Sequence, residues 1–442
     1  MRPRSLALLA ALVAAAPAWA ARVEAQDTST GTPASTGTPA PTPTPTSTGT
    51  PASTPTPNVV LSGFVQTDWV VSRQSSQNEI GPTGAPLNEN RFTLRRGHLR
   101  ADAEQGMILG SLEIDANTIN GPQLRPIDAE ASIRWPPRAP GESAWAMATI
   151  GLFKTPFGFE VLEADNRRPF LERSTVIRAL FPGEYDLGLR MKGGWRFLDY
   201  QLGLMNGDPI GERQFPGRDP NTSKDIVGRV GVDTHPAARV RVLAGFSWVS
   251  GMGFHKGSPS TKDVLVWRDA NLNGIVDPTE IQVIPGSAAT PSQSFKRHAI
   301  GADVRVLVDV PWAGELALRG ELVWATNLDR AIEPSDPVAA GHDQRQRGWY
   351  VGFTQMIGPH AQVGLRYDRY EPDADASSHV AGKLISSDSS YTTLAFMAAA
   401  RLAKARLVLE YDKNKNPLGR GTNGLPTTLK DDTLTLRGEV SF

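Results

Sequence analysis

The chain has 442 residues, with 46 Lys or Arg, 46 Asp or Glu and no Cys. Its balanced charge argues against a general nucleic-acid-binding protein, which would carry a basic surface. The absence of cysteine excludes disulfides, a cysteine nucleophile and a cysteine-based zinc site. The sequence also lacks the short hydrolase and phosphate-binding motifs, so it gives no indication of an enzyme.

Residues 1–25 have the pattern of a secretory signal peptide. Arg2 and Arg4 supply the positive charge, and the apolar segment 6–17 that follows is too short to span a bilayer. Residues 26–57 are mostly Thr, Pro, Ser, Gly and Ala, a composition with little to bury. We expect this segment to be a disordered linker, either a plain tether or a spacer that contacts the cell wall. The folded domain is then 58–442.

From Val59 onward, segments of about ten residues alternate apolar and polar side chains and end in turns. Antiparallel strands whose two faces meet different environments produce this period of two. In the last segment, Leu434 and Leu436 face one way and Thr435 and Arg437 the other. Sixteen strands are predicted: 59–73, 91–104, 107–118, 127–135, 144–152, 184–193, 195–206, 223–234, 238–249, 294–310, 314–327, 345–357, 360–371, 387–400, 403–412 and 432–442. A break in the alternation at Arg95-Arg96 predicts a β-bulge.

Three features favour a transmembrane barrel over a soluble sandwich. Charges of both signs recur on the polar faces, as in a water-filled lumen. Short turns alternate with long connections, as they do at the two ends of outer-membrane barrels. Aromatic residues near strand ends are typical of interfacial girdles. They are Trp69, Trp248, Trp324, Trp349, Tyr350, Tyr367 and Tyr411. The predicted fold is therefore an all-β, transmembrane antiparallel β-barrel of about sixteen strands.

The connection 153–183 is long, apolar and rich in cations. A connection of this length in a compact domain is usually functional. Because its apolar residues would aggregate in solvent, we expect the segment to fold inward against the barrel wall as a constriction loop. It would then present its cations to the lumen.

Several motifs lie in and around this loop. They are GLFKTPFGFE at 151–160, RPFLERS at 168–174, FPG at 181–183, DLG at 186–188 and GLMNG at 203–207. RFTLRR at 91–96 and the terminal Phe442 add to the pattern. Together they resemble the phosphate-selective porins of the O/P type, over 58–442. The resemblance implies a homotrimer in the lipid of the Gram-negative outer membrane, with a pore for small anions such as phosphate. A complete arginine ladder, as in the best-known members, does not align here.

Cations in a narrow pore bind anions by charge and by bidentate hydrogen bonds. The predicted pore and anion-binding residues are Arg95, Lys154, Arg167, Arg168, Arg173, Arg178 and Arg190. Further arginines are predicted on the wall at Arg229, Arg319, Arg366, Arg406 and Arg437. These either bind solute or pair with wall carboxylates such as Glu315, Glu321, Asp368 and Glu410. The loop cations have their own potential partners in Glu160, Glu163, Asp165 and Glu172.

A separate motif, DANLNGIVDPTE at 269–280, satisfies the spacing of a calcium-binding EF-hand loop. The predicted calcium ligands are Asp269, Asn271, Asn273, the Ile275 carbonyl, Asp277 and Glu280. The flanking segments are strand-like, so a true EF-hand is not expected, and a chance polar turn is the alternative. The calcium would be structural, and no cofactor is expected for transport.

The sequence thus supports an outer-membrane porin for passive diffusion of small anions such as phosphate. One alternative is a structural or adhesive barrel whose linker and calcium-binding loop contact a surface. The other is a porin for other small solutes, cationic or carboxylate.

Overall fold

The computed structural model describes residues 57–74, 87–136, 144–209, 221–380, 382–386, 389–420 and 426–442. The predicted signal peptide and all of the predicted linker except Pro57 lie outside these residues. No helix in the described ranges is long and apolar enough to cross a membrane.

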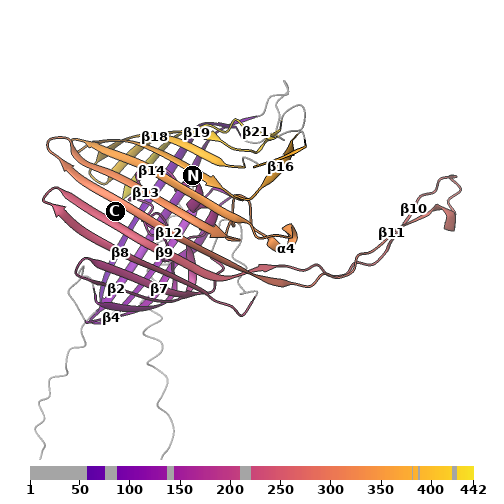
Figure 1. Ribbon diagram of the computed structural model, residues 1–442, viewed down its shortest axis with the longest axis horizontal. Coiled ribbons are helices and arrows are strands. Elements are labelled where there is room, and N and C mark those ends of the chain that lie inside the picture. Colours follow the sequence, from indigo (N-terminus) through magenta and orange to yellow (C-terminus); the bar gives the residue numbers. More distant parts are fainter. Residues whose placement is uncertain are drawn as a thin grey trace, which may run out of the picture. The chain divides into compact units, whose positions relative to one another are not determined.

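The chain forms a closed antiparallel barrel of sixteen strands, in which each strand pairs with the next and β1 pairs with β22 (Figure 1). The strands are β1 (Asn58–Gln74), β2 (Asn88–Gln105), β3 (Ile108–Asn117), β4 (Gln123–Trp135), β5 (Ala146–Lys154), β6 (Tyr185–Trp195), β7 (Leu198–Met205), β8 (Asp225–Ala237), β9 (Val240–His255), β12 (Gln293–Val310), β13 (Gly314–Thr326), β14 (Arg345–Ile357), β15 (Ala361–Glu371), β18 (Tyr391–Leu402), β19 (Ala405–Lys415) and β22 (Thr433–Ser441). The predicted fold class and all sixteen predicted strands are confirmed.

Small elements lie in the connections. Three two-stranded ribbons pair β10 (Val264–Trp267) with β11 (Ile281–Ile284), β16 (Ser377–Val380) with β17 (Lys383–Ser386), and β20 (Gly419–Arg420) with β21 (Pro426–Thr427). The short helices are α3 (Thr175–Leu180), η1 (Pro278–Glu280) and α4 (Pro337–Ala340). Figure 1 shows β10 and β11 on an arm that continues from β9 and β12.

The strand faces alternate as the sequence predicts. On β22, Thr435, Arg437 and Glu439 are buried inside the barrel, whereas Val440 is exposed on its outer surface. The predicted bulge is also present. Gln66 pairs with Arg96 but Thr67 pairs with Leu94, so Arg95 is the extra residue.

The outer surface carries exposed apolar side chains, including Ile150, Leu189, Val304 and Val351. The inner surface carries buried charges, such as Asp68, Arg229 and Glu410. A closed barrel that is apolar outside and charged inside is stable in a bilayer, because lipid covers the apolar band and every backbone group is paired. The domain is therefore a transmembrane barrel of the Gram-negative outer membrane.

Two aromatic girdles flank the apolar band. Trp69, Trp324, Trp349 and Tyr411 are exposed toward the end with long connections. The girdle at the opposite end was not predicted from the sequence; it is formed by Trp135, Trp145, Trp195 and Trp312. The prediction that Tyr350 belongs to a girdle was wrong. Tyr350 is adjacent to the outward-facing Trp349 and so points into the barrel, where its side chain is 2% exposed.

The main hydrophobic core lies inside the barrel, where the connection between β5 and β6 packs against the wall. Phe157, Val176 and Ile177 of this connection are fully buried with Val323 of β13. Two wall glycines allow the close approach. A Cβ at Gly301 would lie 2.9 Å from Phe157, and one at Gly348 would lie 2.6 Å from Val176. The predicted inward fold of the loop is confirmed, and we call residues 155–184 the constriction loop.

Candidate pore constriction

Hydrogen bonds attach the constriction loop to several strands of the barrel wall. Backbone N–H groups of Phe159 and Glu160 donate to the Glu321 carboxylate of β13 at 3.1 and 3.2 Å. Further along the loop, the Leu171 N–H donates to Glu410 of β19 at 2.9 Å. Arg437 of β22 donates to the Leu171 carbonyl at 2.7 Å. The loop is therefore fixed across the lumen.

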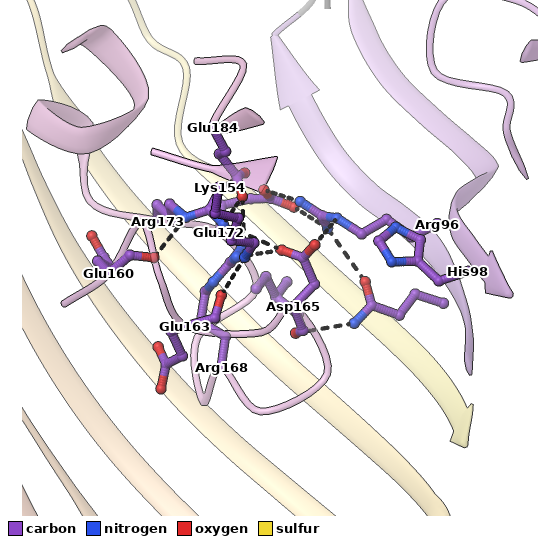
Figure 2. Close-up of polar contacts among 12 residues, drawn as sticks. Arg96, His98, Lys154, Glu160, Glu163, Asp165, Arg168, Glu172, Arg173 and Glu184 are labelled. Carbon is purple, nitrogen blue, oxygen red and sulfur yellow. Dashed lines mark hydrogen bonds and ion pairs between the residues drawn. The ribbon is translucent and has the colours of Figure 1, made fainter. Parts of the chain in front are cut away.

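A dense charge cluster links the loop to β1 and β2 (Figure 2). Asp165 pairs with Arg168 and lies 3.7 Å from Arg96 and 3.6 Å from Arg173. Burial opposes ionisation of Asp165, but Arg96, Arg168, Lys154 and Arg173 outweigh it and hold the carboxyl pKa well below its usual range. Asp165 is therefore anionic at neutral pH, among the predicted pore cations.

Glu172 is the second anion of this cluster. Its carboxylate accepts hydrogen bonds from Arg95 at 2.8 Å, Arg96 at 3.1 Å and Arg437 at 2.9 Å. Burial opposes its ionisation, yet these arginines lower its pKa well below the usual value. The bulge at Arg95 lets two consecutive arginines reach one carboxylate, which a regular strand would not allow.

The base of the loop holds Lys154 and Arg173. Lys154 donates to the Glu163 carbonyl at 2.8 Å and lies 3.4 Å from Glu184. Arg173 donates to the Glu160 carbonyl at 2.9 Å and also pairs with Glu184. Figure 2 shows these groups gathered around Asp165 and Glu172.

The structure brings four of the seven predicted pore cations together in this cluster: Arg95, Lys154, Arg168 and Arg173. Arg190 lies apart on β6, where it pairs with Glu130 at 2.8 Å and stacks on Phe153. Arg167 and Arg178 have exposed side chains. Of the seven, Arg95, Lys154, Arg168, Arg173 and Arg190 each pair directly with a carboxylate.

The wall arginines are also engaged, mostly with partners other than those considered from sequence. Arg229 pairs with Asp303, Arg437 with Asp68, and Arg319 with Glu163 at 3.4 Å. Arg366 lies 3.5 Å from Asp368, one of the wall carboxylates predicted as partners. Arg406 donates to the Arg168 and Pro169 carbonyls of the loop.

Arg305, on the luminal face of β12, was not predicted as a pore residue from the sequence. It pairs in register with Arg319 of β13, so two like charges lie directly opposite each other. Both guanidinium groups lie over the ring of Phe159 in the loop, at 4.3 and 5.9 Å from its centroid. Both Nε atoms are buried without a hydrogen-bond partner, and Arg305 has no ion pair among the residues described. The alternation of polar and apolar residues is enough to place Arg305 on the polar face. Its position opposite Arg319 can be predicted only if the register between β12 and β13 is known.

The predicted calcium segment lies at the tip of the β10–β11 ribbon. Glu280 accepts hydrogen bonds from the N–H groups of Ala270 and Asn271, and Asp269 accepts from that of Gly274 at 2.8 Å. The first and last predicted ligands therefore lie close together. Gly274 has φ +70°, which suits glycine at the sharp turn. Asp277 instead caps η1 by accepting from the Thr279 N–H. In the described residues, no group of three or more Asp, Glu, His or Cys is arranged to hold a metal.

Calcium binding by Asp269, Asn271, Asn273 and Glu280 thus stays a prediction. We expect millimolar calcium to slow trypsin cleavage at Arg268, because the ion would order the exposed tip. The double substitution Asp269→Asn/Glu280→Gln should remove this protection. Glu315→Gln at the other end of the barrel is the control. Equal cleavage rates with calcium and with a chelator would contradict the prediction.

No protein-family model and no curated protein sequence matches the chain. Solved outer-membrane proteins do match in structure. Pseudomonas putida OprB is 11% identical with a TM-score of 0.51, over 87% of this chain and 94% of that one. Vibrio cholerae OmpT, solved as a trimer, is 9% identical with a TM-score of 0.50, over 87% and 99%. An anion-selective porin from Comamonas acidovorans is 12% identical with a TM-score of 0.48, over 88% and 100%.

The chain has the fold of the outer-membrane porins. Its sixteen-stranded barrel is narrowed by the inward constriction loop. Membership of the O/P family stays a prediction from the motifs, because no family model matches.

Proposed function

We propose that this barrel is a passive diffusion channel whose constriction favours small anions, phosphate among them. The observation that carries the proposal is the Arg305–Arg319 pair over Phe159. Glu163 pairs with Arg319 but not with Arg305, so the two guanidinium groups held side by side keep an excess of positive charge. Their N–H forks fit the oxygens of phosphate or carboxylate. The loop supplies the stacking ring and so keeps both groups at the constriction.

Pairing elsewhere in the constriction supports this assignment. Asp165, Glu172 and Glu184 already neutralise the cations around them. A passing anion would have to displace a buried carboxylate to reach Arg168 or Arg173. Arg305 is the more accessible binding group, and the exposed Arg167 and Arg178 would attract anions toward the loop.

We further propose that the channel assembles as a homotrimer. The support is the motif resemblance together with the trimeric form of the V. cholerae protein, which has the same fold.

The double substitution Arg305→Gln/Arg319→Gln tests the site. We expect it to reduce the chloride-to-potassium permeability ratio. It should also weaken phosphate block of the chloride current by about tenfold or more, because a charge-assisted bidentate contact contributes roughly 1.5–3 kcal/mol. The measurement is the current through single channels in planar bilayers as phosphate is added.

Arg196→Gln/Arg239→Gln, in two exposed turns, removes the same charge as the matched control and should leave both values unchanged. If the double variant keeps the wild-type permeability ratio and phosphate block, the pair is not an anion site.

A further inference from the structure

On three strands of the barrel, a cation lies two residues beyond an outward-facing aromatic of the girdle, toward the end with long connections. Side chains two residues apart on a strand share a face, so each cation lies on the outer surface just beyond the aromatic. The pairs are Trp349 with Arg347 on β14, Tyr367 with Arg369 on β15, and Tyr411 with Lys413 on β19. We call Arg347, Arg369 and Lys413 the outer basic row.

More cations extend this row. Arg345 of β14, Lys415 of β19 and Lys296 of β12 have exposed side chains on the same outward faces, one or two steps further out. The acidic residues beside them are fewer. Glu371 pairs with both Arg347 and Arg369, Asp375 pairs with Arg345, and Asp432 accepts a hydrogen bond from Tyr411. Asp373, near Arg345, is a fourth acidic residue, so the six cations still outnumber the acidic residues at the edge of the apolar band.

The ion pairs do not by themselves explain the row. The side chains of Arg347 and Arg345 are 57% and 65% exposed. Exposed pairs contribute little to stability. Lys413 has no ion pair within the described part of the chain and is exposed beside Tyr411. A charged row at this depth instead faces the headgroups of the outer leaflet, because girdle aromatics lie at headgroup level.

We infer that the outer basic row binds the phosphate groups of a phosphorylated glycolipid, such as lipid A, in the outer leaflet. Arginine forks bind phosphate oxygens bidentately, and each basic residue near an anionic lipid surface contributes about 1 kcal/mol to the attraction. The neighbouring Trp349 and Tyr367 would pack against the acyl chains below the phosphate. This inference rests on the membrane orientation of the barrel and does not depend on its transport activity.

Titration of the folded, detergent-solubilised protein with purified lipid A tests the inference. Tryptophan fluorescence is the readout, because Trp349 lies directly opposite Arg369 on the neighbouring strand. The triple variant Arg347→Gln/Arg369→Gln/Lys413→Gln should bind lipid A at least about tenfold more weakly than the wild type. A control triple variant, Arg196→Gln/Arg239→Gln/Lys404→Gln, removes the same charge from exposed turns at the other end. It should bind within about twofold of the wild type.

Two further titrations separate the sources of phosphate. Dephosphorylated lipid A should bind the wild type weakly. Its affinity should match that of phosphorylated lipid A for the triple variant Arg347→Gln/Arg369→Gln/Lys413→Gln, which we call the row variant. In the Arg305→Gln/Arg319→Gln variant, which lacks the proposed pore site, inorganic phosphate alone should give no saturable signal at millimolar concentration. Equal binding of phosphorylated and dephosphorylated lipid A, or equal losses in both triple variants, would overturn the inference. Saturable inorganic phosphate binding would assign the row to the free ion instead.

Glu371→Gln gives a readout that does not depend on loss of binding. It removes the carboxylate shared by Arg347 and Arg369, so lipid A should bind more tightly. If the row variant fails to fold, unchanged or weaker lipid A binding by Glu371→Gln contradicts the inference.

Discussion

Asp165→Asn should lower the free energy of unfolding by about 3–5 kcal/mol, because it removes the carboxylate that pairs with buried Arg168. It also removes one of two carboxylate partners from Arg96 and from Arg173. The Asp165 side chain is 7% exposed and faces Arg96, Arg168 and Arg173. Asparagine keeps the shape and can accept a hydrogen bond, but it does not balance these charges. Denaturant unfolding of the protein in lipid vesicles measures the loss.

Asp102→Asn is the control for this substitution. Asp102 pairs with Arg100 on the same wall at 2.9 Å, but its side chain is 45% exposed. Removing an exposed pair costs about 1 kcal/mol or less. If both variants lose the same stability, the Asp165 cluster does not hold the loop in place.

The pH dependence follows from the same carboxyl. The pKa of Asp165 is lower in the folded protein than in the unfolded chain. The ionised carboxylate therefore stabilises the fold fully above the unfolded pKa. This stabilisation is lost as pH falls through the lower pKa of the folded protein. We therefore expect the wild-type constriction to persist at pH 4. In Asp165→Asn, the part of the stability that depends on this carboxyl should be absent at every pH.

Gly158→Ala should detach one end of the loop and increase the single-channel conductance. Gly158 has φ +59°, and a Cβ there would lie 1.8 Å from Glu321 Oε1. The new methyl group would displace the carboxylate that accepts the Phe159 and Glu160 N–H groups. Backbone strain costs about 1–2 kcal/mol, and the loss of these hydrogen bonds adds to it.

Gly106→Ala distinguishes the effect of backbone strain from that of the contact with Glu321. Gly106 has φ +62°, but nothing lies within 4 Å of a Cβ at this position, in the turn between β2 and β3. This control should carry a similar backbone strain with unchanged conductance. A Gly158→Ala channel that conducts like the Gly106→Ala channel would show that Glu321 does not hold the loop in position.

The barrel could be predicted because alternation is a local property of sequence. The outward Leu436 and inward Arg437 follow from position alone, and so does the bulge at Arg95. Tyr350 was misplaced only because it was grouped with its aromatic neighbour rather than assigned by strand phase.

The contacts of the constriction could not be predicted in the same way. Arg437 meets Glu172 across 265 residues of chain, and Arg406 meets the loop backbone across a similar separation. These partners depend on where the loop lies inside the closed barrel. The pairing of Arg305 with Arg319 depends on the register between β12 and β13, which one residue of slip would abolish. The loop cations were recognisable as a group, but their individual carboxylate partners were not.

The most direct test of the account is the reversal potential of the wild-type protein in a planar bilayer under a KCl gradient, repeated as phosphate is added. We predict a reversal potential closer to the equilibrium potential of chloride than to that of potassium, and a chloride current that phosphate reduces. Cation selectivity, or no selectivity, would contradict the anion site while leaving a porin for other solutes. The absence of any conductance would contradict the channel and favour a structural barrel.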